Sequence, residues 1–194
     1  MRQNLVALNR KTWWPWLAIA AVLLAAALQL HAQGRLWICA CRQIYLWVGD
    51  TWSSDNSQHI FDPYTFSHIL HGVIFFWALA ALAPRLPFLW RLSLATTIEA
   101  GWEMLENSAF VIDRYRAATA SLAYQGDTVI NSMSDIFACA IGFWLARYLG
   151  FRRSLIFFAL TEIMMILWIR DSLLLNILML IYPIEAIKTW QMGF

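Results

Sequence analysis

Long apolar segments are the feature that most constrains how this chain can fold. The run Trp13–Leu30 contains no charged residue, and several later runs of similar length contain few ionisable side chains. An α-helix needs about 20 mostly apolar residues to cross a bilayer core of about 30 Å. The sequence therefore predicts an integral membrane protein built from helices.

Composition agrees with this and excludes other classes. Hydrophobic residues make up 61% of the chain and charged residues only 13%, whereas soluble domains average about 45–50% apolar and about 25% charged residues. A water-soluble enzyme or signalling domain is excluded, and so is a disordered chain. The net charge of +2 gives no indication of a nucleic-acid partner. We expect residues 1–194 to form one integral membrane domain.

Six membrane spans are predicted, and the fold class is an all-α, polytopic membrane helix bundle. The predicted spans are Trp13–Leu30, Tyr64–Ala83, Phe88–Glu106, Thr128–Tyr148, Ser154–Ile169 and Ser172–Ile187. Arg170 and Asp171 form the only polar break between the last two. A single long kinked element is therefore the alternative there to a tight helical hairpin.

The distribution of Lys and Arg predicts the orientation, because these residues concentrate in cytoplasmic loops. With the N-terminus inside, nine lie in cytoplasmic segments: Arg2, Arg10, Lys11, Arg85, Arg91, Arg147, Arg152, Arg153 and Lys188. Five lie outside: Arg35, Arg42, Arg114, Arg116 and Arg170. We therefore expect both termini to be cytoplasmic and the long loops 31–63 and 107–127 to lie outside.

The first outer loop contains an apolar stretch, residues 34–48, that is too short to span. We expect it to lie along the outer membrane surface or to re-enter slightly. Cys39 and Cys41 lie within it. An oxidising compartment would permit a disulfide between them, although so small a ring is uncommon. Free or metal-bound thiols are the alternatives.

Three predicted spans carry ionisable side chains, which cost from about 2.5 kcal/mol upward in hydrocarbon and therefore indicate function. His68 and His71 are three positions apart in the second span and share a helix face. The third and fourth spans each carry one polar stripe at helical spacing: Glu99, Glu103 and Glu106, and Asp127, Asn131 and Asp135.

In the predicted topology these stripes meet in two layers, about 5 and about 10 Å below the outer surface at a rise of about 1.5 Å per residue. The upper layer contains His68, Glu103 and Asn131, and the lower layer contains His71, Glu99 and Asp135. No Lys or Arg lies at this depth in the three stripes. The acids therefore need a bound cation, shared protons or protonated histidines.

Three interpretations of this cluster remain open. In the first, His68, His71, Glu103 and Asp135 hold one divalent metal, zinc, manganese or iron, that activates water. In the second, catalysis by His68, His71, Glu99, Glu103 and Asp135 is general acid–base chemistry without metal. In the third, the stripes form a structural hydrogen-bond network or a path for protons or ions.

Other residues are candidates for binding a substrate. Arg114 and Arg116 suit a phosphate at headgroup level, although both could simply extend toward the interface. Asn131 and Asp127 would orient the site. His59 lies in a polar run that leads into His68; it could cap the cavity or lie in an ordinary solvated loop.

Five motifs resemble those of an uncharacterised family of small alphaproteobacterial inner-membrane proteins: Asn56–Ile60, Tyr64–Gly72, Glu103–Ser108, Ile112–Arg116 and Gly126–Asp135. The resemblance implies a bacterial inner membrane and brings no established activity. A weaker, partial resemblance links the acids of the third and fourth spans to VanZ-like membrane proteins. His68, His71 and the cysteine pair depart from that second pattern.

The leading hypothesis is an enzyme that hydrolyses, or transfers a group on, a lipid or lipid-linked substrate. A site about 5–10 Å deep matches the boundary between headgroups and acyl chains. A small-molecule or proton-coupled transporter is the alternative, but the inner halves of these spans are mostly apolar. A non-catalytic binding or assembly factor is the third possibility. The sequence does not predict the oligomeric state.

Overall fold

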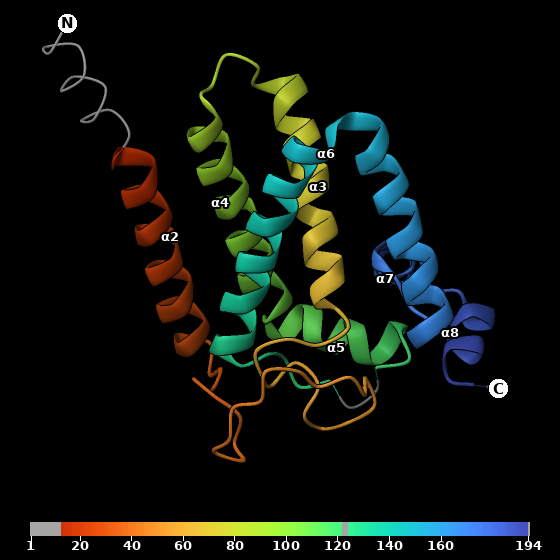
Figure 1. Ribbon diagram of the computed structural model, residues 1–194. Helices are drawn as coiled ribbons and strands as arrows, with labels where there is room; N and C mark the ends of the chain where they lie inside the picture. The colour runs from red at the N-terminus through yellow and green to blue at the C-terminus, as the bar shows by residue number, and fades with distance from the viewer. Residues whose placement is uncertain (1–12, 122–123, 194) are drawn as a thin grey trace, which may run out of the picture.

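The computed structural model describes residues 13–121 and 124–193, and every regular element in these ranges is a helix (Figure 1). The helices are α2 (Trp13–Ala32), α3 (Thr65–Leu82), α4 (Phe88–Glu106), α5 (Ala109–Ala118), α6 (Val129–Ile169), α7 (Leu173–Ile181) and α8 (Glu185–Gln191). In the described residues, extended pairing is limited to an isolated bridge between Trp47 and Phe61. The predicted all-α class is confirmed for this part of the chain.

Three of these helices, α2, α3 and α6, are long and apolar enough to cross a membrane. Helix α4 has 19 residues, a similar length, but it carries Arg91 and three glutamates. The bounds of α2, α3 and α4 differ from the first three predicted spans by at most two residues. The predicted membrane-like helices are therefore present.

Helix α6 folds back on itself at Gly150, where φ is 71° and ψ is 169°. Glycine adopts this left-handed region without a steric penalty. Beyond the turn, the ring of Phe151 packs 5.2 Å from that of Trp77, and Ser67 Oγ near the other end of α3 donates to Met165 Sδ at 3.8 Å. The two arms of α6 thus form a hairpin (Figure 1), matching the separate fourth and fifth predicted segments.

The sixth predicted span is wrong. Residues 172–187 are split into α7, of nine residues, and α8, which begins at Glu185. Pro183 separates them; proline lacks an amide donor and disfavours helical geometry in the residue before it. Nine helical residues span only about 14 Å. This segment therefore stays at the end of the bundle that carries the long loops, away from the first turn of α2 (Figure 1).

Helix α3 and the first arm of α6 are in backbone contact because each has a glycine at the crossing. A Cβ atom on Gly72 would lie 2.6 Å from the amide nitrogen of Phe143, and one on Gly142 would lie 2.8 Å from the carbonyl carbon of Ile69. Small residues permit this close approach between apolar helices. The crossing places the polar first turns of both helices side by side.

The bundle has an apolar half and a polar half. The core away from the long loops is built from Val73, Phe76, Leu79, Leu92, Ala95, Phe143 and Ala146. The buried polar side chains of α3, α4 and the first arm of α6 lie mostly toward the loop end. The apolar core therefore closes the bundle below the candidate site.

The loop from Gln33 to Tyr64 has no helix. Many of its apolar side chains are exposed: Leu36, Trp37, Ile44, Tyr45, Leu46, Trp47 and Trp52. The carbonyl oxygens of Leu36 and Trp37 accept the amides of Val129 and Ile130, which holds the loop against the start of α6. The predicted position on a membrane surface stays a prediction.

Candidate functional site

The structure brings together His68, His71, Glu99, Glu103 and Asp135 at the loop end of α3, α4 and α6. The two glutamates are fully buried, and His68 and Asp135 are 7% and 3% exposed. These residues lie within the first two turns of α3 and α6 and the last two of α4. These five side chains from the three predicted stripes therefore lie together at this end, but not in the two predicted layers, because His68 lies closest to Glu99.

Glu99 organises both imidazoles. Its Oε1 lies 2.6 Å from His68 Nδ1, and both of its oxygens lie 3.0 Å from His71 Nδ1. Because each ring uses Nδ1 toward the carboxylate, each Nε2 is left available. This is the arrangement in which a carboxylate fixes the tautomer and orientation of a metal-binding histidine.

The free nitrogen of His68 faces α6. His68 Nε2 lies 3.9 Å from Asp135 Oδ2, and Asp135 Oδ1 accepts a hydrogen bond from Thr65 Oγ1 at 3.2 Å. His68, Glu103 and Asp135 each offer a ligand atom, and these atoms lie within 4.8 Å of one another. One imidazole and two carboxylates from three helices are a donor set suited to a divalent transition metal.

Glu103 is the unusual member of this group. Neither of its carboxylate oxygens receives a hydrogen bond from the described residues. His68 Nδ1 lies 3.3 Å from Oε1, but this nitrogen is already bonded to Glu99. A buried carboxylate without donors is expensive unless it is protonated or binds a cation. Glu103 therefore needs a proton, a bound cation or the charge of a protonated His68, whose Nδ1 lies 3.3 Å away.

His71 joins the cluster differently from the prediction. His71 lies in one group with His68 and Glu99. The group that contains Glu103 and Asp135 also contains His68, but not His71. His71 also stacks on Phe75, with ring centroids 5.8 Å apart. The structure therefore links His71 to the predicted metal ligands through Glu99.

A second acidic group extends the site toward the loops. Glu103, Glu106 and Asp127 have ligand atoms within 4.8 Å of one another. Asp127 is hydrogen-bonded by Asn107 Nδ2 and by the hydroxyl of Tyr124, both at 2.8 Å. Asp127 is thus supported by the protein, unlike Glu103.

Burial raises the pKa values of the acids in the segments that precede α3 and α6. The pKa of Asp127 is raised because burial penalises the charged carboxylate, while the hydrogen bonds from Asn107 and Tyr124 oppose the shift. The pKa of Asp62 is raised for the same reason and is opposed by the backbone amide of Tyr64 and the charge of His68. The pKa of the Tyr124 hydroxyl is raised well above its ordinary value by burial and by Asp127, so it remains a donor.

The remaining predicted binding residues lie outside the cluster. Asn131 Nδ2 bonds Asp62 Oδ2 at 3.4 Å and so supports the start of α3. Arg114 donates to the carbonyl oxygens of Leu180 and Ile181 at the end of α7. Their predicted roles in binding a substrate stay predictions.

Arg116 and His59 also lie apart. Arg116 Nε donates to the carbonyl oxygen of Tyr124 at 2.6 Å, and its side chain is 41% exposed. His59 lies near Cys39, Cys41 and Asp55 in the first loop. The exposed charge of Arg116 pairs with Asp113 Oδ1 at 3.5 Å.

The structure adds three residues that the sequence analysis did not single out. Thr65 supports Asp135, and Asn107 and Tyr124 support Asp127. Asn107 lies four residues after Glu103 and Thr65 three before His68, so helical spacing could have indicated both. Tyr124 lies in an irregular segment, where spacing gives no signal.

A pocket of about 370 Å³ lies at the same end of the molecule. It is lined by the loop around Asp50 and Trp52, the end of α6 at Trp168 and Arg170, and residues 191–193. The side chains of the acidic cluster do not line it. The cluster is enclosed by protein and lies apart from this pocket.

Residues 30–193 match the family described as a protein of unknown function, DUF2585. The chain is 49% identical over 177 residues to a "UPF0314 protein" of Paracoccus denitrificans, covering 91% of this chain and 92% of that protein. A "UPF0314 protein" of Sinorhizobium fredii is 46% identical over 185 residues, covering 95% and 94% of the two chains. No solved structure matches. The predicted resemblance to an uncharacterised family is confirmed, and the resemblance to VanZ-like proteins stays a prediction.

Proposed function

The chain belongs to the DUF2585 family of proteins of unknown function, and on that premise we propose that it is a metal-dependent membrane enzyme. It would hydrolyse, or transfer a group on, a lipid or lipid-linked substrate. His68, Glu103 and Asp135 would hold the metal, with Glu99 orienting His68 and His71. The proposal rests on the buried cluster rather than on any activity known in the family.

One observation carries the metal site: Glu103 is fully buried and receives no hydrogen bond among the described residues. One of its oxygens lies in a group with ligand atoms of His68 and Asp135. Imidazole plus carboxylate ligands suit zinc, manganese or iron(II). Three protein ligands would leave a coordination position for a water that the metal activates.

The topology supports a five-crossing arrangement in place of six. Helices α2, α3, α4 and the two arms of α6 would each cross the bacterial inner membrane, and α7 and α8 would stay on the outer side. This moves Lys188 and the C-terminus outside, while the excess of Lys and Arg on the side of the N-terminus remains. The cluster would then face the periplasm.

The depth of the cluster and the surface around it favour a lipid substrate. His68 lies three residues and Asp135 six residues inside their helices, or about 5 and about 9 Å along the axis. The loop above exposes Trp37, Trp47 and Trp52, and tryptophans of this kind favour the membrane interface. Arg116 would bind the phosphate of a headgroup.

The first experiment tests the metal. The full chain, purified in detergent and stripped with a chelator, is titrated with zinc, manganese and iron(II) by calorimetry. We expect one metal per chain, and at least about a hundredfold weaker binding in Glu103→Gln and Asp135→Asn. Asp113→Asn is the matched control, because that carboxylate is 74% exposed and should leave binding unchanged.

The second experiment tests the reaction. The metal-loaded protein is incubated with inner-membrane lipids, and released headgroups are measured by mass spectrometry. Product formation by the wild type but not by Glu103→Gln supports an enzyme. Normal folding without metal binding or product in any variant would reject the proposal in favour of a structural network, and metal-dependent ion flux in liposomes would reject it in favour of a carrier.

A further inference from the structure

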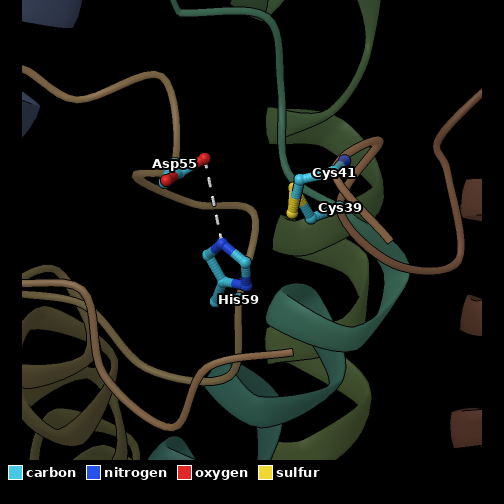
Figure 2. Close-up of side chains that lie close together, drawn as sticks. All are labelled: Cys39, Cys41, Asp55 and His59. Carbon is cyan, nitrogen blue, oxygen red and sulfur yellow. Dashed lines mark hydrogen bonds and ion pairs between the residues drawn. A yellow bond between two sulfur atoms is a disulfide. The ribbon is translucent and has the colours of Figure 1, made fainter. Parts of the chain in front are cut away.

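A second cluster of reactive side chains lies in the first loop, separate from the acidic cluster. Cys39, Cys41, Asp55 and His59 each offer an atom within 4.8 Å of the others. Figure 2 shows the ring of His59 directed toward Asp55, with the two sulfur atoms beside it. Cys39 and Cys41 are joined by a disulfide, one of the alternatives that their spacing left open.

The two sulfurs of this disulfide are in different environments. Cys41 is exposed, whereas Cys39 is only 6% exposed. The backbone amide of Cys41 lies 3.1 Å from Cys39 Sγ and is positioned to donate to it. An attacking thiol would therefore reach Cys41, and the protein would stabilise negative charge on Cys39.

His59 supplies a second donor next to the sulfurs. Its side chain is 1% exposed, and its Nδ1 accepts the backbone amide of Tyr45 at 3.2 Å. The proton of the neutral ring is therefore on Nε2. That atom has no hydrogen-bond partner among the described residues and lies 3.9 Å from Asp55 Oδ1. A buried, unpartnered N–H beside a disulfide is suited to a sulfur that becomes negatively charged.

We propose that Cys39–Cys41 is a redox-active disulfide that accepts two electrons from a dithiol, with His59 Nε2–H stabilising the Cys39 thiolate as it leaves. The site is independent of the metal-dependent reaction proposed above. It uses the sulfur of Cys41, the exposed residue of the pair, as the point of attack. The partner is any molecule that presents two thiols to the outer loop.

The exchange balances in two steps. A thiolate of the partner, formed by loss of a proton to solvent, attacks Cys41 Sγ; the Cys39–Cys41 bond breaks, and Cys39 leaves as the thiolate. The second thiolate of the partner then attacks the partner's sulfur in the mixed disulfide and releases Cys41 as a thiolate. The partner becomes a disulfide, and both protein thiolates take up protons from solvent.

The same four residues suit a metal less well. A metal on His59 Nε2 would need the ring proton on Nδ1, where it would face the amide hydrogen of Tyr45. Metal-binding histidines instead donate from their second nitrogen to an acceptor. The hydrogen bonding of His59 therefore favours thiol exchange.

Substitutions of Asp55 and His59 should change the rate of disulfide reduction in opposite directions. Its carboxylate is 41% exposed and lies within 4.8 Å of the sulfurs, so its charge opposes the Cys39 thiolate. Removing the His59 donor should slow reduction, and removing the Asp55 charge should speed it. If the two residues had only structural roles, their substitution would not change the reduction rate in opposite directions.

The experiment uses the full chain in detergent and reduced glutathione as the probe, with acid quenching and mass spectrometry. We expect a mixed disulfide on Cys41, reduction about tenfold slower in His59→Phe, and reduction a few-fold faster in Asp55→Asn. In the reduced protein, the pH dependence of alkylation at Cys39 should shift upward in His59→Phe and downward in Asp55→Asn. Asp50→Asn, an exposed acid of the same loop, is the control and should match the wild type.

Three results would overturn the proposal. The mixed disulfide could form on Cys39, or Asp55→Asn could react no faster than the wild type. The reduced protein could also bind one zinc ion per chain and fail to exchange with glutathione, which would establish a metal site. The Asp55→Asn comparison holds even if His59→Phe does not fold, because Asp55 is exposed.

Discussion

Two groups of buried acids lie at the loop end of this bundle, and the protein treats them differently. In the first group, Glu162 accepts the backbone amides of Leu173 and Leu174 at 3.0 and 3.2 Å. In the second group, Glu103 is even more deeply buried than Glu162 but receives no hydrogen bond from the described residues. The two groups therefore differ in the hydrogen-bond donors that the protein supplies.

Asp171 completes the first group. It accepts the amide of Ser172 at 2.9 Å and the side-chain amide of Asn176 at 3.4 Å. The first turn of a helix has unpaired amides and a partial positive charge, which stabilise carboxylates. The acids around α7 therefore support the fold, whereas Glu103 needs a proton or a cation from elsewhere.

The largest effect is expected from separating the helices that build the second group. In Gly142→Ala the new methyl collides with the backbone at Ile69, so α3 and α6 must move apart. We expect a loss of at least about 3 kcal/mol of unfolding free energy and of metal binding, while the bonds of Glu162 to α7 persist. Denaturant unfolding in detergent measures the first effect.

Gly101→Ala is the matched control for this change. A Cβ atom on Gly101 has no neighbour within 4 Å, so alanine there should stabilise α4 by about 0.5–1 kcal/mol. Equal destabilisation by the two substitutions would contradict the role of the close crossing.

The second comparison is between the two acids themselves. Glu162→Gln weakens charge-assisted bonds to the start of α7 and should lower the unfolding free energy of the metal-free protein by about 2 kcal/mol. Glu103→Gln removes a carboxylate that receives no hydrogen bond, and it should change the unfolding free energy of the metal-free protein by less than about 0.5 kcal/mol. A large loss of stability in Glu103→Gln would show that the carboxylate has a partner in the protein.

The pH dependence of stability extends the comparison. Asp171 receives hydrogen bonds, but its burial still disfavours the charged carboxylate. Burial raises the pKa of Asp171 to about 6, although Ser172, Asn176 and Tyr64 donate to it. Between about pH 4 and pH 6 the folded protein thus keeps a proton that the unfolded chain has released, so stability falls as the pH rises through this window.

The expected size of this fall is up to about 3 kcal/mol. Thermal unfolding of the wild type and of Asp171→Asn across pH 4–7 measures it, and the difference in stability between them should shrink as the pH falls from about 6 to about 4. A constant difference across the range would contradict the assigned shift.

The smallest effect is expected where the two groups meet. The hydroxyl of Tyr115 lies 2.8 Å from Glu106 Oε1 and 2.9 Å from Asn176 Oδ1. Tyr115→Phe should cost about 1 kcal/mol of unfolding free energy and leave metal affinity within about threefold of the wild type. A loss of metal binding as large as that of Glu103→Gln would mean that the groups are one site.

Much of the fold and of the acidic cluster follows from spacing in the sequence. Apolar runs predict α2, α3 and α4, and helical periodicity places Glu99, Glu103 and Asp135 on facing stripes. Both depend on local geometry that every helix shares.

Other features depend on contacts between distant segments. Pro183 ends α7 in a run whose composition alone predicts a span. Arg114 binds the carbonyl oxygens at the end of α7, a partner that no local pattern reveals. The missing donors of Glu103 and the approach of His59 to the cysteines likewise depend on how loops pack, which periodicity does not encode.

The glycine crossing has a mechanical consequence. Gly72 and Gly142 bring the backbones of α3 and α6 into contact. We therefore expect these two helices to resist sliding past one another or separating. Helix α4 meets them through side chains, and its own Gly101 faces open space. If a molecule is to reach the enclosed carboxylates, we expect α4 to move while α3 and α6 stay in contact.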